Sequence, residues 1–173
     1  MLSKERLHQL FDYKDGNFYW KLDKGRAKKG DKANRTTDGR YEQIKFDQEL
    51  HWFHRAVFMY HYGYLPQTID HANGNKLDNK IENLRPATYS ENNANIGLRK
   101  DNKSGIKGVC WNKVKNAWHI SVENKQLGIK YQKDIKDLEL AELVAMEARD
   151  KFHGNFANHG NQTFPKPTEE QLA

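Results

Sequence analysis

The chain has 173 residues, a formal net charge of +6 at pH 7, and 36% hydrophobic and 12% aromatic residues. So polar a composition excludes one large apolar core, whereas the aromatic content excludes a wholly disordered chain. We therefore expect small, separately packed modules, and the basic balance favours a polyanionic partner.

The cysteine content and the hydropathy of the sequence indicate the cellular compartment in which the protein is expected to work. Cys110 is the only cysteine of the sequence, which excludes an internal disulfide and a cysteine-based zinc cluster. We thus expect no structural zinc and a cytoplasmic, intracellular protein. No apolar run approaches the ~20 residues that span a bilayer, and residues 1–6 lack the apolar core of a signal peptide, so no membrane partner is expected.

The first third of the chain predicts short elements of both kinds. A helix is expected over residues 3–12, capped by Ser3, before a hairpin turn at residues 15–17. Loose alternation over residues 41–53 predicts strands, with Tyr41, Ile44 and Phe46 on one side. A helix over residues 53–62, ended by the influence of Pro66, should follow.

The next segment predicts a strand, a polar loop, a second strand and a helix. Residues 68–71 form the first strand, residues 72–80 the loop, and Leu84 begins the second strand. Thr88 and Glu91 have the spacing of a capping box, so a helix should start at Thr88. This helix would carry Asn92 in about its first turn.

An acid and a histidine stand side by side at the end of the first of these strands, Asp70 and His71. A neutral histidine is a suitable general base for activating water, and carboxylate and amide oxygens are ligands that Mg²⁺ accepts. Asn83 is our candidate for holding the imidazole in one tautomer. The combination suits hydrolysis of a phosphodiester with one divalent ion. Taken alone, the Asp-His pair could be a surface hydrogen bond and the Asn-Gly-Asn segment a simple turn. Neither explanation accounts for their occurrence together in this order along the chain.

The segment from His54-Arg55 through Asp70-His71, Asn73-Gly74-Asn75, Asn83-Leu84-Arg85 and Asn92 resembles HNH nucleases of the phage homing-endonuclease type. The resemblance covers about residues 10–95 and implies a ββα-metal fold around one Mg²⁺ or Mn²⁺. It implies that Asp70 and Asn92 ligate the metal, that His71 activates water, and that Asn83 positions His71. Arg85 and Arg55 are candidate DNA contacts, although Arg85 could equally support the loop. His54 either approaches the site or holds its helix.

The second half predicts a separate module. Residues 97–105 lack periodicity and are expected to be a linker. Three short strands should follow, at residues 109–111, 117–122 and 127–131, before an amphipathic helix over residues 137–152. The polar, proline-bearing tail at residues 161–173 is expected to be poorly ordered.

Charge is segregated within this second module. Residues 98–133 contain nine basic and two acidic side chains, whereas the exposed face of the following helix is largely acidic. Residues 103–158 resemble the AP2 DNA-binding domain, through Ser104-Gly105-Ile106-Lys107-Gly108-Val109, the paired tryptophans, the alanine-rich helix and residues 152–158. The likeness implies a three-stranded sheet that enters the DNA major groove. The implied contacts are Lys107, Trp111, Lys113, Lys115, Trp118 and Lys130, although either tryptophan could instead be a core residue.

Together these patterns predict an α+β chain, with an HNH nuclease domain at residues 1–96, a linker at 97–105, an AP2-like domain at 106–160 and a tail at 161–173. The expected function is metal-dependent cleavage of double-stranded DNA by a monomer or weak dimer, phage-encoded and acting in the host cell. Two alternatives remain at this point: a non-catalytic DNA-binding regulator, and an RNA nuclease.

Overall fold

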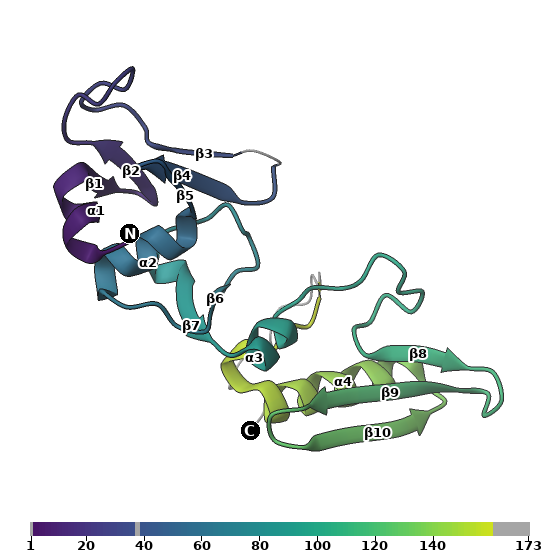
Figure 1. Cartoon of the computed structure of the whole chain (residues 1–173). Helices are drawn as coiled ribbons and strands as arrows, with labels where there is room; N and C mark the ends of the chain where they lie inside the picture. Colours follow the sequence, from purple (N-terminus) through teal and green to yellow (C-terminus); the bar gives the residue numbers. More distant parts are fainter. Residues whose placement is uncertain (1, 37–38, 161–173) are drawn as a thin grey trace, which may run out of the picture. The chain divides into compact units, whose positions relative to one another are not determined.

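The computed structural model describes residues 2–36 and 39–160, so the predicted tail at 161–173 lies outside the described residues. Small antiparallel sheets and short helices alternate along the chain, which is compatible with the α+β class (Figure 1). The chain separates into two compact units, and the division falls between Asn93 and Ala94. In the described part of the chain, no helix is long and apolar enough to cross a membrane.

The first unit begins with helix α1 (Lys4–Leu10), capped as expected by Ser3, whose hydroxyl accepts from the Arg6 N–H at 3.3 Å. The helix is shorter than the predicted residues 3–12, because Phe11 adopts an extended conformation and pairs with Trp20. Strands β1 (Phe11–Lys14) and β2 (Asn17–Trp20) then form the predicted hairpin. Its turn needs left-handed backbone at Asp15 (φ 48°) and Gly16 (φ 77°), which glycine adopts without strain.

A three-stranded sheet follows, made of β3 (Asn34–Thr36), β4 (Glu42–Phe46) and β5 (Glu49–Trp52) in this order. Strand β3 was not predicted, because its three residues sit in a polar, basic stretch. The predicted inward face of the next strand was wrong at one position. The strand starts at Glu42, so alternation buries Glu42 with Ile44 and Phe46 and leaves Tyr41 outside the strand.

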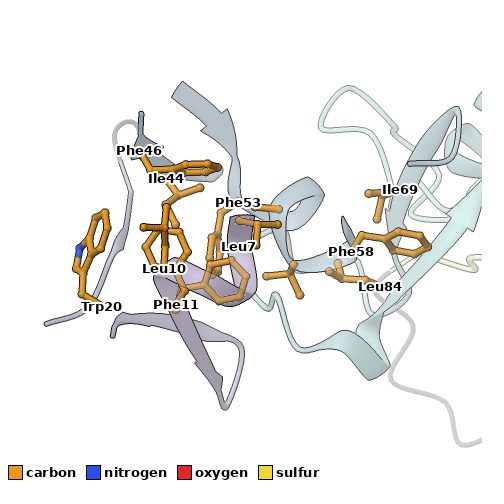
Figure 2. Close-up of a cluster of buried hydrophobic side chains, with 13 residues drawn as sticks. Leu7, Leu10, Phe11, Trp20, Ile44, Phe46, Phe53, Phe58, Ile69 and Leu84 are labelled. Carbon is orange, nitrogen blue, oxygen red and sulfur yellow. The ribbon is translucent and has the colours of Figure 1, made fainter. Parts of the chain in front are cut away.

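Helix α2 (Phe53–Tyr62) has the predicted bounds, but Pro66 is not what ends it. Gly63 adopts the left-handed conformation (φ 77°), and its N–H bonds to the Met59 carbonyl, so a glycine C-cap ends the helix. Figure 2 shows aromatic and aliphatic side chains from both sides of α2 converging in one core. Its fully or nearly buried members are Leu7, Leu10, Phe11, Phe18, Trp20, Ile44, Phe46, Phe53, Ala56, Val57, Phe58, Ile69 and Leu84.

Strand β6 (Thr68–His71) pairs antiparallel with β7 (Leu84–Ala87) as the sequence predicted. The polar loop and a short 3₁₀ turn, η1 (Ile81–Asn83), connect them, and helix α3 (Tyr89–Ala94) follows. The predicted capping box is present: the Thr88 N–H donates to Glu91 Oε2 at 2.7 Å, and the Glu91 N–H donates to Thr88 Oγ1 at 3.3 Å. Two strands and a helix therefore follow one another in this segment, and the Asp-His pair ends the first strand.

The second unit is one antiparallel sheet covered by one helix. Its strands β8 (Val109–Asn112), β9 (Ala117–Asn124) and β10 (Ile129–Ile135) lie in the order β10-β9-β8. Helix α4 (Leu138–His153) packs on the sheet (Figure 1), with Asp137 as its N-cap, and the turn η2 (Gly154–Phe156) follows. The core consists of Ile106, Val109, Ile120, Val122, Ile135, Ala141, Ala145 and Ala148.

Phe53 anchors α2 in the first core and allows a test of this packing. Phe53→Ala should lower the free energy of unfolding by about 3–5 kcal/mol, because it leaves a cavity at a fully buried position. Urea denaturation measures the change. Tyr62→Ala, at the exposed far end of the same helix, is the control and should cost about 1 kcal/mol or less. Equal losses for the two variants would contradict the core described here.

Candidate active site and nucleic-acid interface

Asp70 and His71 occupy the end of β6 and are both buried, with 4% and 6% of their surface exposed. Their neighbours on β6 and β7, Ile69 and Leu84, belong to the apolar core. The strand therefore holds both polar side chains rigidly. Because neighbouring side chains of a strand point to opposite faces, the two have different partners.

An amide holds the His71 ring through Nε2, which lies 3.1 Å from Asn79 Oδ1. The other end of this amide, Asn79 Nδ2, donates to Glu42 Oε2 at 3.0 Å. A carboxylate can only accept, so Glu42 dictates that the nitrogen of Asn79 faces β4 and its oxygen faces the histidine. His71 Nε2 must then carry the proton, which leaves Nδ1 as the basic nitrogen of the ring.

Burial keeps the histidines of this region neutral. It lowers the pKa of His71 below the usual 6.5, and the opposing effects of the Asn79 hydrogen bond and of Asp70 are smaller. The neighbouring His54 ring lies edge-on to His71 at 5.4 Å between centroids, and burial lowers the pKa of His54 to about 3. Of the two roles considered for His54, the structure supports approach to the site. A neutral imidazole with a free-base nitrogen can accept a proton from water.

Arg85 is the partner of Asp70 across the β6–β7 pair. Its Nε and Nη2 lie 2.8 and 2.7 Å from Asp70 Oδ2. Arg85 thus pairs with the Asp70 carboxylate, a contact that neither of its two expected roles, phosphate binding and support of the loop, includes. Arg55 lies in the first turn of α2, half-buried, and its charge contributes to the lowered pKa of His54.

Asn83 does not make the expected contact with His71; its side chain bonds to the polar loop. Asn83 Oδ1 accepts from the Asn73 N–H at 2.9 Å, and Nδ2 donates to the Asp78 carbonyl at 2.7 Å. Asn83 directly precedes β7, whereas Asn79 lies in the loop that passes between His71 and Glu42, so Asn79 reaches the ring. Sequence reasoning missed both Asn79 and Glu42, because nothing in a loop asparagine or a strand glutamate signals a partner far along the chain.

The donor set at Asp70 suits a hard cation. In the described part of the chain, no three His, Cys, Asp or Glu side chains gather where they could hold a metal. A cation at Asp70 would therefore depend on few protein ligands, such as the Asn92 amide oxygen, and on water and phosphate oxygens. Mg²⁺ and Mn²⁺ accept such ligands, whereas structural zinc requires a closed set of Cys and His. The chemistry of the Asp70 and Asn92 side chains therefore suits the divalent ion that the resemblance implies.

In the second unit, the lysines predicted as DNA contacts differ in their surroundings. Lys107 is half-buried, and its amino group donates to the Ala94 and Ile96 carbonyls at 2.6 Å each. Burial, together with the charge of Arg149, lowers the pKa of Lys107 to about 8. This lysine is a structural group rather than a surface contact. Lys115 pairs with Asp134 at 2.6 Å, whereas Lys113 and Lys130 are exposed.

The two tryptophans lie on the helix-facing side of the sheet. Trp111 is opposite Trp118 in the β8–β9 register, and each shares its face with a core residue, Val109 or Ile120. Trp118 packs against this core, as one alternative had it, and Trp111 remains 43% exposed at its edge. The open face of the sheet instead presents Cys110, His119, Ser121, Glu123, Lys130, Gln132 and Asp134.

Comparison with known proteins supports the importance of the Asp-His segment. The family model described as HNH endonuclease matches residues 51–94, which include Asp70, His71, Asn79, Asn83 and Asn92. Protein 3.8 of Escherichia phage T7 is 37% identical over 93 residues, which cover 51% of this chain and 72% of the phage protein. No solved structure matches the chain significantly. From this match and this relative, we conclude that the chain carries an HNH endonuclease domain at residues 51–94 and belongs to the same family as Protein 3.8.

Proposed function

We propose that this protein is a metal-dependent endonuclease of the homing type that hydrolyses phosphodiester bonds in double-stranded DNA. The observation that carries the proposal is the His71 imidazole, buried, neutral and fixed through Nε2 by Asn79. A base held in one tautomer and orientation beside a carboxylate is what activation of water requires. The phage relative favours a phage-encoded protein that acts in the host cell.

In this mechanism, His71 Nδ1 takes a proton from the water that attacks phosphorus. Asn79 and Glu42 keep Nε2 protonated, so the proton that arrives at Nδ1 creates an imidazolium whose N–H groups stay oriented. Arg85 holds the Asp70 carboxylate in place. A divalent cation held by Asp70 and Asn92 would supply stabilisation of the negative charge at phosphorus and at the leaving oxygen.

The lowered pKa of His71 determines the direction of the pH dependence. The base is active only when neutral, and burial favours the neutral form. The cleavage rate should therefore hold as pH falls to the usual histidine pKa of 6.5, and decline only as pH passes through the lower pKa of His71.

The second unit is proposed to hold DNA as an AP2-like module, through fewer residues than first expected. Lys113 and Lys115 belong to the β8–β9 turn, and Lys130 lies on the open sheet face. Lysines act on phosphates as point charges and lack the planar fork of arginine that reads guanine. The proposed grip is therefore largely independent of DNA sequence and sensitive to salt.

The first of three substitution tests of the proposed function concerns the chemistry. Purified protein should nick or linearise a plasmid when Mg²⁺ or Mn²⁺ is added, and His71→Ala should slow cleavage at least about 100-fold, because a general base contributes this much or more. Binding of the same DNA should be unchanged in a filter or gel-shift assay. His8→Ala, at an exposed histidine of the same unit, is the matched control. Cutting at the full rate by His71→Ala would refute the assignment of His71 as the general base. Faster cutting of an RNA of matched sequence would indicate that the substrate is RNA and not DNA.

The second prediction tests the support behind the base. Glu42→Gln should lower kcat about tenfold at unchanged KM. A glutamine can donate as well as accept, so it no longer fixes which end of the Asn79 amide faces His71, and part of the rate gained from the general base is lost. Single-turnover cleavage and a KM determination separate the two constants. Glu49→Gln, an exposed glutamate on the neighbouring strand β5, should have no effect. If Glu42→Gln leaves kcat intact, Glu42 has no positioning role.

The third prediction separates binding lysines from a structural one. Lys113→Ala and Lys130→Ala should each weaken DNA binding and lower the slope of log affinity against log salt by about 1. Lys107→Ala should instead lower the melting temperature, because two carbonyls lose their donor. Fluorescence anisotropy at several salt concentrations, with thermal unfolding alongside, provides both readouts. An undiminished salt slope for both exposed variants would remove them from the interface.

A further inference from the structure

A row of rings runs from His71 to the surface of the first unit. The His71 and His54 centroids are 5.4 Å apart, the His54 and Tyr41 centroids 5.8 Å, and the Tyr41 and Trp52 centroids 5.6 Å. The row thus links β6, the first turn of α2, the residue before β4 and the last residue of β5. The catalytic candidate is therefore in continuous contact with residues well outside the Asp-His segment.

The outer end of this row is open to solvent, and a cation lies over the ring next to it. Trp52 is 46% exposed, whereas Trp20 of the same unit is 9% exposed and belongs to the core. Lys76, from the polar loop that follows His71, places its amino group 4.7 Å from the centroid of the Tyr41 ring. Helix α2 begins directly after Trp52, whose side chain makes no capping hydrogen bond, so the positive end of the helix dipole lies beside the indole.

We propose that Trp52, with Tyr41 and Lys76, forms a subsite that stacks one unpaired nucleobase of the substrate at the outer end of the row of rings that begins at His71. This inference rests on the proposed function and refines it. An exposed indole is a stacking surface for any base, and a neighbouring ammonium meets the flanking phosphate. A purely apolar partner would not account for Lys76 over the Tyr41 ring or for the row of rings that reaches His71.

The chemistry of the subsite selects the form of the nucleic acid. In an intact duplex the faces of the bases are covered by their neighbours, so a ring platform can only engage a base that has left the stack. Stacking is also tolerant of sequence, because every base has a π-face. The subsite therefore favours a strand with at least one unpaired base and contributes little to recognition of particular bases.

The test compares two short single strands, an oligothymidylate and the abasic strand of equal length, which keeps the phosphates and lacks the bases. Binding to the full chain is measured by fluorescence anisotropy in EDTA, where no metal-dependent cleavage occurs. Wild type should bind the thymidine strand about tenfold more tightly than the abasic strand, which is within the range for one stacked base. Trp52→Ala should abolish this ratio, and Trp52→Phe should retain it.

The matched control is Tyr62→Ala, which removes an exposed aromatic from the opposite end of α2, roughly 15 Å along the helix. It should leave the ratio unchanged. Lys76→Gln should weaken both strands equally and leave the ratio intact, because it removes only a phosphate contact. A ratio that survives Trp52→Ala, or one that is lost equally in Tyr62→Ala, overturns the subsite.

A second measurement covers the case in which Trp52→Ala fails to fold. Stacking on the indole should quench tryptophan emission when the thymidine strand binds, and Trp52→Phe should lose that part of the quenching while it keeps its affinity. Undiminished quenching in Trp52→Phe contradicts the proposal. Base-dependent binding without plasmid cleavage would refute the nuclease and leave the subsite standing, whereas cleavage without base-dependent binding would do the reverse.

Discussion

The amide of Asn79 is the interaction on which the candidate site depends. It is almost fully buried, and it joins a carboxylate on β4 to an imidazole on β6. An amide has one accepting and one donating end, so a fixed acceptor on one side determines what the other side offers. Glu42 thereby decides the tautomer of a histidine that it does not touch. Buried polar groups of this kind are stable only when each has its partners, and here they do.

Glu42 itself is tolerated in the interior because amides surround it. Asn34 of β3 donates to the same oxygen as Asn79, at 2.9 Å, and Lys32 lies 3.5 Å from the other. The short strand β3 therefore does more than extend the sheet, because its Asn34 donates a hydrogen bond to the Glu42 carboxylate. The aromatic core around α2 holds β4 and β6 at the positions that make the link possible. Packing and chemistry are thus coupled through one charged side chain.

The basic composition of the second unit overstates the surface available to DNA. Lys107 donates to two backbone carbonyls, and Lys115 forms an ion pair with Asp134. Both amino groups therefore already have partners within the protein. Both tryptophans lie on the helix-facing side of the sheet. The first unit, by contrast, exposes the Trp52 indole at the end of a row of rings that begins at His71, and Lys76 lies over the Tyr41 ring of that row. In the two proposals, the second unit contributes charge to DNA binding, and the first contributes contact with one unpaired base.

Local features of the chain could be read directly from the sequence. The hairpin at Asp15-Gly16, the bounds of α2 and the capping box at Thr88 each follow from residues only a few positions apart. The end of α2 was attributed to Pro66, although Gly63 was the nearer signal. The adjacency of Asp70 and His71 likewise needed no structure. What only the tertiary structure decided was which distant partner each polar side chain meets: Glu42 behind Asn79, Arg85 on Asp70, and a backbone carbonyl instead of a phosphate for Lys107. The reason is that turn and helix signals depend on neighbouring backbone geometry, whereas the partner of a buried donor or acceptor depends on how separate strands pack.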